Sequence, residues 1–308
     1  QSVQHPATGL PTSFSRSVDP ALNNVSFTYD AAVTAIVLGH SGAFPAAKKA
    51  LGTYLRMPLP SRGGFEFNTA YNTADRTPTL EYRVHGGPIF WMAIALMRYS
   101  QASHEEAFGE KGVAILEWSR THLPHKDGGV AMSHRDFWAS VMSVENNWIY
   151  YAALRLAAQV LPDGQVREAL VRERQGVYGW LQVQQTNRGL GDGIGALDVY
   201  THALLVGPEA HLEDGAWDAA GLAAWAKRHI DALDERFQIP GSALYDYTDA
   251  VESARIGRAR LAWLEGTEQV SVAYRTWARW FERQGDRAFA KTLRMKAAIS
   301  HAQVMEYS

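Results

Sequence analysis

Four acidic residues stand at or near the starts of apolar segments of this sequence. They are Asp30 in FTYDAA, Glu145 in SVENNW, Asp198 in GALDVYT and Glu265 in WLEGTEQ. Two carboxyl groups on either side of a glycosidic bond can hydrolyse it, because one protonates the leaving oxygen while the other activates water or attacks the sugar. The pattern therefore indicates carboxylate acid and base chemistry, provided that the fold brings these residues together.

Each of these carboxylates also has a purely structural explanation. An acidic residue in the first turn of a helix is stabilised by the helix dipole and the free backbone amides, by roughly 0.3 to 1 kcal/mol. Four such residues in polar or aromatic surroundings, all on otherwise apolar segments, favour a shared cleft over four independent helix starts. We expect the four to converge on one mouth.

The local sequence suggests different roles for the two glutamates. Glu265 follows Trp263 and Leu264, and apolar neighbours disfavour the charged form of a carboxyl group. We therefore expect Glu265 to be the general acid.

The base is expected among the other three carboxylates. Glu145 precedes Asn146 and Asn147, whose amides could hold it ionised, so we expect Glu145 to be the base. Asp30 and Asp198 are the alternative bases. We expect inversion at the anomeric carbon, since a wide mouth leaves room for a water molecule.

Several aromatic and polar residues near the same segment starts are candidates for substrate binding. Aromatic rings can stack on the apolar faces of sugar rings, although they also fill protein cores. We expect at least two of the aromatic candidates to stack on a sugar. The candidates for substrate binding are Tyr29, Arg83, His85, Trp91, Trp138, Asn147, Trp148, Tyr200 and His202.

The sequence argues against other kinds of chemistry. It has no cysteine and neither an HExxH nor a GxSxG motif, which excludes thiolate catalysis and gives no support for zinc or serine hydrolysis. The GLGDGIG stretch lacks the preceding strand and the Lys-Ser or Lys-Thr of a phosphate loop. We expect no cofactor and no metal site.

Composition and charge limit the partners. The formal net charge is −2 and no block of five or more Lys or Arg occurs, so a nucleic-acid partner is not expected. No apolar run approaches the length of a membrane span. The first residue, Gln1, instead of Met, predicts export with removal of a leader, and thus a secreted or periplasmic protein.

The carboxylates lie on a repeated pattern. Apolar segments begin near Asp30, Pro88, Glu145, Asp198 and Glu265, and each precedes a more polar, amphipathic segment. This alternation is typical of helical hairpins with an inner and an outer helix. The expected pairs are 30–38 with 44–55, 88–99 with 105–121, 145–160 with 166–184, 198–206 with 217–237, and 264–281 with 286–304.

Closing the hairpins into a ring buries the apolar helices, whereas a linear solenoid leaves one side wet. We therefore predict an all-α (α/α) toroid of five to six hairpins, forming one domain over residues 1–308 with an irregular segment at 1–25. The long connections lie at the end where the inner helices begin. Alternating apolar residues over 64–84 predict one short β-hairpin there.

The segment starts TYDAAV, SVENNWIYYAAL, LDVYTHALLV and WLEGTEQVSVAY resemble those of bacterial secreted six-hairpin (α/α)-barrel proteins. That superfamily includes glycoside hydrolases, polysaccharide lyases and sugar epimerases, so the resemblance implies a polysaccharide or oligosaccharide ligand. In the family 8 cellulases a Glu opens the first inner helix, and here Asp30 takes that place.

A glycoside hydrolase is the first hypothesis, and two others remain open. The first is a polysaccharide lyase, in which Tyr29, Tyr200, His85 or His202 would take a proton and Arg83 would neutralise a uronate, with a sugar epimerase as the related alternative. A non-catalytic protein of an exopolysaccharide system would keep the aromatic cleft without productive carboxylate geometry.

Overall fold

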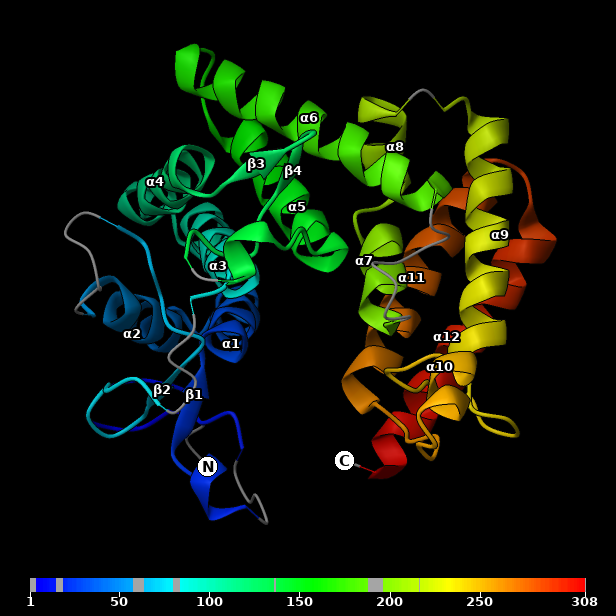
Figure 1. The fold of residues 1–308 in the computed structure, drawn as a ribbon, viewed down its shortest axis with the longest axis horizontal. Coiled ribbons are helices and arrows are strands. Elements are labelled where there is room, and N and C mark those ends of the chain that lie inside the picture. Colours follow the sequence, from blue (N-terminus) through cyan, green and yellow to red (C-terminus); the bar gives the residue numbers. More distant parts are fainter. Residues whose placement is uncertain are drawn as a thin grey trace. The chain divides into compact units, whose positions relative to one another are not determined.

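The computed structural model describes residues 4–14, 19–57, 64–79, 84–135, 137–187, 196–215 and 217–307. These residues are mainly helical (Figure 1). The chain divides into two compact units, Gln1–Val177 and Tyr178–Ser308, and each is described by itself. The single domain expected over residues 1–308 stays a prediction.

The first unit contains three inner helices and their outer partners. The helices are α1 Thr28–His40, α2 Phe44–Leu55, α3 Gly86–Ser103, α4 Glu106–His122, α5 Val144–Val160 and α6 Gln165–Asn187, the last of which continues into the second unit. α3 packs against both α1 and α5, α2 packs on α1, and α4 packs on α3. The alternation of inner and outer helices is confirmed in this unit.

Small residues allow the helices of the first unit to approach closely. Ala31, Ala35 and Gly39 are buried and recur every four residues along α1, which gives the low ridge that close helix packing needs. In α4, a Cβ at Gly112 would lie 2.7 Å from Met97 Cγ and 2.8 Å from the carbonyl oxygen of Ala93 in α3. Only glycine fits at this position.

The second unit is built around α11. Its other helices are α7 Leu197–Leu205, α8 Pro208–Asp214, α9 Ala219–Phe237, α10 Ala250–Arg255 and α12 Arg287–Tyr307, and α11 spans Leu264–Arg283. α11 packs against α7 and α12, and α9 packs against α7, α8 and α10. The indole of Trp277 is fully buried and donates to the carbonyl of Leu204 at 3.0 Å, which ties α11 to the end of α7.

The helices expected from the sequence are all present, with starts within two residues of their predicted positions. The sequence analysis missed α8 and α10. Gly207, at φ +84°, and Pro208 indicated the end of one helix, but Pro208 also occupies the first turn of α8. Proline is favoured there because its missing N–H has no partner in a first turn anyway.

Two short antiparallel ladders accompany the helices. β1, Val25–Phe27, pairs with β2, Ala70–Asn72, and β3, His125–Lys126, pairs with β4, Gly129–Val130. Asp127 and Gly128 have φ values of +54° and +97°, as a two-residue hairpin turn requires. The Asp-Gly pair could have predicted this second hairpin.

The hairpin expected over residues 64–84 is present in part. Isolated bridges pair Tyr71 with Pro78 and Asn68 with Val84, and the N–H of Asn72 donates to Thr77 O at 2.8 Å across the turn. Residues 80–83, with Leu80 and Tyr82, lie outside the described residues. The partner strand β1 was not predicted, because only long-range pairing places it there.

The N-terminal segment is anchored although it has little regular structure. Its 3-10 helix η1 spans Pro20–Leu22, and a second, η2, spans Phe137–Ser140 farther along the chain. Lys49 Nζ donates to Pro6 O at 2.6 Å, and Thr53 Oγ1 donates to Thr8 O at 2.5 Å. Both contacts hold the segment on α2.

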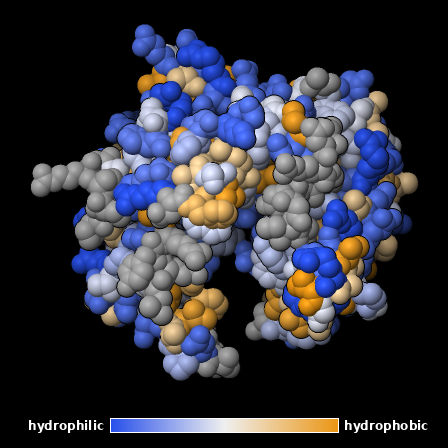
Figure 2. Space-filling model, viewed as in Figure 1, coloured by the Kyte–Doolittle hydropathy of each residue, from blue (hydrophilic) through white to orange (hydrophobic). Residues whose placement is uncertain are grey.

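The face in view in Figure 2 is mostly hydrophilic, with apolar residues in small groups. Within the described part of the chain, no helix combines the length and the apolar character needed to cross a membrane.

Candidate active site

The starts of the three inner helices of the first unit lie next to one another. The rings of Tyr29 in α1 and Trp91 in α3 meet edge to face, with centroids 5.5 Å apart. A Cβ at Gly87 in α3 would lie 2.5 Å from Asn146 Oδ1 in α5, so α5 begins in contact with the first turn of α3. The openings that carry Asp30 and Glu145 therefore belong to one cluster of helix starts.

Asp30 is half-buried in the first turn of α1. Burial raises the pKa of its carboxyl group, and a hydrogen bond with the side chain of Ser13 acts in the opposite direction. The helix start also favours the charged form, but desolvation is the larger effect here. The environment that we expected around Glu265 thus surrounds Asp30.

His85 and Trp138 lie together beside the same helix starts. His85 is the N-cap of α3, and its ring lies 5.3 Å from that of Trp138 in η2. The N–H of Gly86 donates to Met132 O at 2.6 Å, which holds the segment before η2 against the start of α3. Both rings are half-buried, as are those of Tyr29 and Trp91, so all four keep some exposed surface.

Asn147 has a structural role that differs from its predicted one. Its Nδ2 donates to Val130 O at 2.9 Å and to Ser143 O at 2.7 Å, and its Oδ1 accepts from Val130 N at 2.8 Å. Both amide hydrogens are thus used. The side chain fastens β4 to the start of α5 and has no donor left for Glu145 or for a sugar.

Trp148 is also placed differently from the prediction. It is 1% exposed, and its ring packs against that of Tyr151 at 5.9 Å. A ring without an exposed face cannot stack on a sugar, so the core-packing alternative describes Trp148. Arg83 lies outside the described residues, as does the whole GLGDGIG stretch, residues 189–195.

One buried carboxylate of the first unit was not singled out from the sequence. Glu66 is 3% exposed and accepts from Arg135 Nη2 at 2.7 Å, and His134 Nε2 lies 2.6 Å away. Burial lowers the pKa of His134 although Glu66 acts against it. Glu66 stands between Phe65 and Phe67 in an alternating stretch, a pattern that gives no signal of a buried carboxylate.

In the second unit, the openings of α7 and α11 are linked by side chains. Asp198 is 7% exposed and accepts from Val199 N at 2.9 Å. Thr201 Oγ1 donates to Gln269 Oε1 at 2.8 Å, and Gln269 Nε2 lies 3.4 Å from Glu265 Oε1. The amide of Gln269 therefore connects α7 with the carboxylate of Glu265.

The surroundings of Glu265 do not match the reason for its predicted role. Its side chain is exposed, whereas Trp263 and Leu264 are half-buried. The side chain of Glu265 is therefore open to solvent although apolar residues precede it in the sequence. The exposure of Glu265 gives no support to the burial from which its acid role was predicted, and that role stays a prediction.

Tyr200 and His202 are buried within α7. Tyr200 is fully buried, its hydroxyl accepts from Arg236, and its ring packs on Phe237 at 5.0 Å. Burial lowers the pKa of His202 to about 4, so this imidazole is neutral at physiological pH. Tyr200 packs as a core residue, as the alternative reading supposed.

The described residues contain no group of three His, Asp or Glu side chains that could hold a metal ion.

No family model and no curated protein sequence matches the chain. Solved structures do resemble it. An endoglucanase from Klebsiella pneumoniae, a family 8 glycosyl hydrolase, aligns over 98% of this chain and 96% of its own, with a TM-score of 0.58 and 12% identity. An alpha-amylase from Clostridium perfringens aligns over 94% and 80%, with a TM-score of 0.59 and 10% identity.

A third similar structure has a different activity. A cellobiose 2-epimerase from Bacillus thermoamylovorans aligns over 75% of this chain and 66% of its own, with a TM-score of 0.55 and 10% identity. The chain therefore shares the predicted all-α (α/α) helical fold with these three structures. Because two hydrolases and an epimerase share this fold, the fold alone does not determine the reaction.

Proposed function

We propose that the protein is a glycoside hydrolase that cleaves a polysaccharide or oligosaccharide, with Asp30 as the general acid. The observation that carries the proposal is the setting of Asp30. Burial raises the pKa of its carboxyl group, and the half-buried rings of Tyr29 and Trp91 lie at the same helix starts. A carboxyl group that keeps its proton to higher pH is suited to protonate a leaving oxygen.

Glu145 is the proposed base. It lies in the first turn of α5, where the free backbone N–H groups favour a negative charge. In the reaction, Asp30 gives its proton to the glycosidic oxygen as the bond to the anomeric carbon breaks. Glu145 takes a proton from the water molecule whose oxygen bonds to that carbon. Direct attack by water inverts the anomeric configuration, and inversion remains part of the proposal.

The test compares Asp30→Asn and Glu145→Gln with the wild type on a panel of bacterial and plant polysaccharides, with products followed by mass spectrometry. Both variants are expected to lower kcat about 10²- to 10⁴-fold while retaining substrate binding. Asp30→Asn should keep most of its activity on a glycosyl fluoride, because fluoride leaves without a proton. A general loss on both substrates would contradict the acid role.

The same assay tests the remaining carboxylates. The participation of Asp198 and Glu265 stays a prediction, and Glu265→Gln is expected to lower kcat only if this carboxylate exchanges a proton with the substrate. The anomeric form of the first product, followed by NMR, distinguishes inversion from retention.

A sugar epimerase is the second candidate, favoured by the likeness to the cellobiose 2-epimerase. An epimerase would yield a product of unchanged mass, a lyase would yield a new double bond that absorbs ultraviolet light, and a binding protein would yield no product. Action outside the cytoplasm, and an association with exopolysaccharide machinery, belong to the proposal and can be tested by cell fractionation and co-purification.

A further inference from the structure

A short extended segment of the second unit, residues 245–248, joins the starts of two inner helices. The N–H of Leu197, at the start of α7, donates to Tyr247 O at 2.8 Å, and the N–H of Trp263, the N-cap of α11, donates to Tyr245 O at 2.8 Å. Isolated bridges pair Thr248 with Ala196 on one side and Asp246 with Ala262 on the other. The segment thus fixes the spacing of the openings that carry Asp198 and Glu265.

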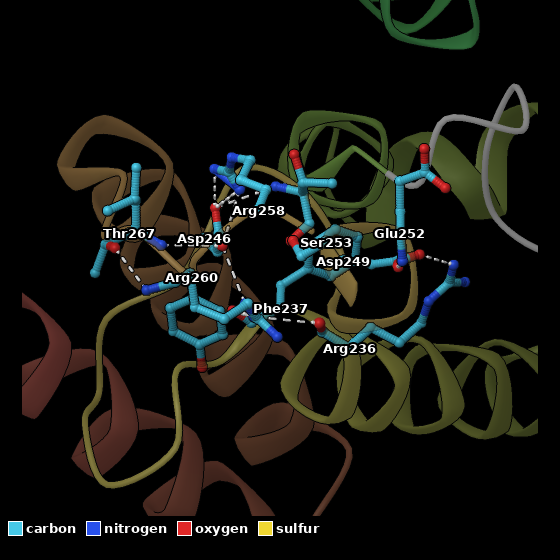
Figure 3. Close-up of polar contacts among 12 residues, drawn as sticks. Arg236, Phe237, Asp246, Asp249, Glu252, Ser253, Arg258, Arg260 and Thr267 are labelled. Carbon is cyan, nitrogen blue, oxygen red and sulfur yellow. Dashed lines mark hydrogen bonds and ion pairs between the residues drawn. The ribbon is translucent and has the colours of Figure 1, made fainter. Parts of the chain in front are cut away.

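A buried ionic cluster holds this segment in place (Figure 3). Asp246 is fully buried, and Arg258 Nη2 donates to its Oδ1 at 2.6 Å while Arg260 Nε donates to its Oδ2 at 3.0 Å. The N–H of Leu261 donates to the same Oδ2 at 3.1 Å. These contacts fasten residues 258–261 to the segment 245–248, so the two stretches of chain hold each other in place.

Tyr247 in this segment and Trp263, whose backbone pairs with the segment, both keep exposed surface. Tyr247 is 41% exposed, and its ring meets that of Trp263 edge to face with centroids 5.1 Å apart. The ring of Trp263 lies against the first turn of α11, where a Cβ at Gly266 would be 2.1 Å from Trp263 Cε3. Gly266 therefore leaves the space that this ring occupies.

Polar groups suited to sugar hydroxyls lie close by in the chain. Glu265 is two residues after Trp263 and is exposed, and the amide of Gln269 lies 3.4 Å from its carboxylate. A pyranose ring offers an apolar face of C–H groups to an aromatic ring and needs hydrogen-bonding partners around its edge. A carboxylate and an amide beside an aromatic ring therefore suit a sugar ligand better than an aliphatic surface of a partner protein.

We propose that Tyr247 and Trp263 form a stacking platform for a pyranose ring of a neutral oligosaccharide. The Asp246 cluster holds the platform in its binding position before the sugar arrives, which limits the ordering that binding requires. The proposal rests on the proposed function in its substrate class, but not on any catalytic step.

The test measures the affinity of cellohexaose and maltohexaose by calorimetry in the Asp30→Asn background, in which turnover is expected to be slow. Tyr247→Ala and Trp263→Ala should each weaken binding about tenfold, as the loss of one stacking contact with its buried area predicts. Tyr247→Phe should bind normally, because the ring and not the hydroxyl makes the contact. Tyr307→Ala, which removes another exposed tyrosine of the same unit, is the matched control.

Gly266→Ala provides a second test that leaves both aromatic residues in the chain. The added Cβ must displace the Trp263 ring, so affinity should fall about as far as in Trp263→Ala, with the thermal transition still present.

If the wild type binds a hexasaccharide and all these variants bind it equally well, the platform is refuted while the proposed function stands. If the wild type binds neither sugar nor any member of the polysaccharide panel, both fall. A change in oligomeric state in place of sugar affinity would instead assign the pair to a protein contact and overturn the platform.

Discussion

Asp30 couples the proposed reaction to the stability of the fold. Its pKa is raised in the folded protein, so the folded state holds this proton at pH values where the unfolded chain has lost it. Stability therefore falls as the pH rises from the unfolded value of 3.8 through the folded pKa, and it stays reduced above that window. A residue that stores this unfavourable energy in a cluster of helix starts is a candidate for function.

Asp30→Asn should accordingly raise the free energy of unfolding at pH 7, and the gain should be smaller at pH 4. Urea titrations at the two pH values measure the difference. Asp75→Asn is the matched control, because hydrogen bonds from Thr77 lower the pKa of Asp75 and the sign is reversed, so this variant should lose stability at pH 7. Equal behaviour of the two variants would contradict the desolvation of Asp30.

At the scale of residues, the sequence identified candidate residues by their type but did not predict the burial and contacts of their side chains. Asn147 was expected to bind substrate and its amide to hold Glu145 ionised, yet this amide forms hydrogen bonds with the backbone of Val130 in β4. Glu265 was expected to be desolvated by its neighbours in sequence, yet it is exposed. Which side of a helix end faces solvent depends on tertiary packing, and local sequence does not contain that information.

At the scale of elements, close packing makes two glycines of similar helical context behave in opposite ways. Gly112→Ala should destabilise the protein by about 1 to 3 kcal/mol, because its Cβ would overlap Met97 and the backbone of α3. Gly176→Ala in α6, where a Cβ meets nothing within 4 Å, should stabilise it by about 0.5 to 1 kcal/mol. Thermal unfolding followed by circular dichroism measures both, and a neutral or stabilising Gly112→Ala would refute the packing of α4 on α3.

The segment between α7 and α11 depends on one buried carboxylate. Asp246→Ala should destabilise the protein by about 2 to 4 kcal/mol, because it leaves two arginines without their partner. The side chains of Arg258 and Arg260 are 29% and 20% exposed. Water can therefore partly replace the lost contact, and the loss of stability should be smaller than for a fully buried ion pair. Glu252→Gln is the control for urea unfolding, since its pair with the exposed Arg255 is screened by water and should contribute little to stability.

At the scale of the whole molecule, the helical repeat could be read from the sequence because inner and outer helices have different compositions. The compositions differ because an inner helix is buried on several sides, whereas an outer helix is buried on one. The sequence did not reveal β1, α10 or the Asp246 cluster, since their partners are distant in sequence or irregular in structure. The candidate site was predicted as a set of helix starts, and the roles within it required the fold.

The N-terminal segment, expected to be irregular, reaches the candidate acid. Ser13 is held by β1, since its N–H donates to Val25 O at 2.9 Å and its Oγ accepts from Phe27 N at 2.8 Å. The same side chain forms the hydrogen bond that lowers the pKa of Asp30 against the effect of burial. A segment outside the helical repeat thus adjusts the proton affinity of the candidate acid.

The upper pH limit of activity then depends on how the chain enters its first helix. A general acid works only while it is protonated, so under the proposed mechanism the alkaline limb of the pH–rate profile follows the pKa of Asp30. Ser13→Ala removes the opposing hydrogen bond and should move that limb to higher pH, with the acidic limb unchanged. The contact between this N-terminal segment and α1 would thus set the working pH range of the proposed reaction without altering the helix starts themselves.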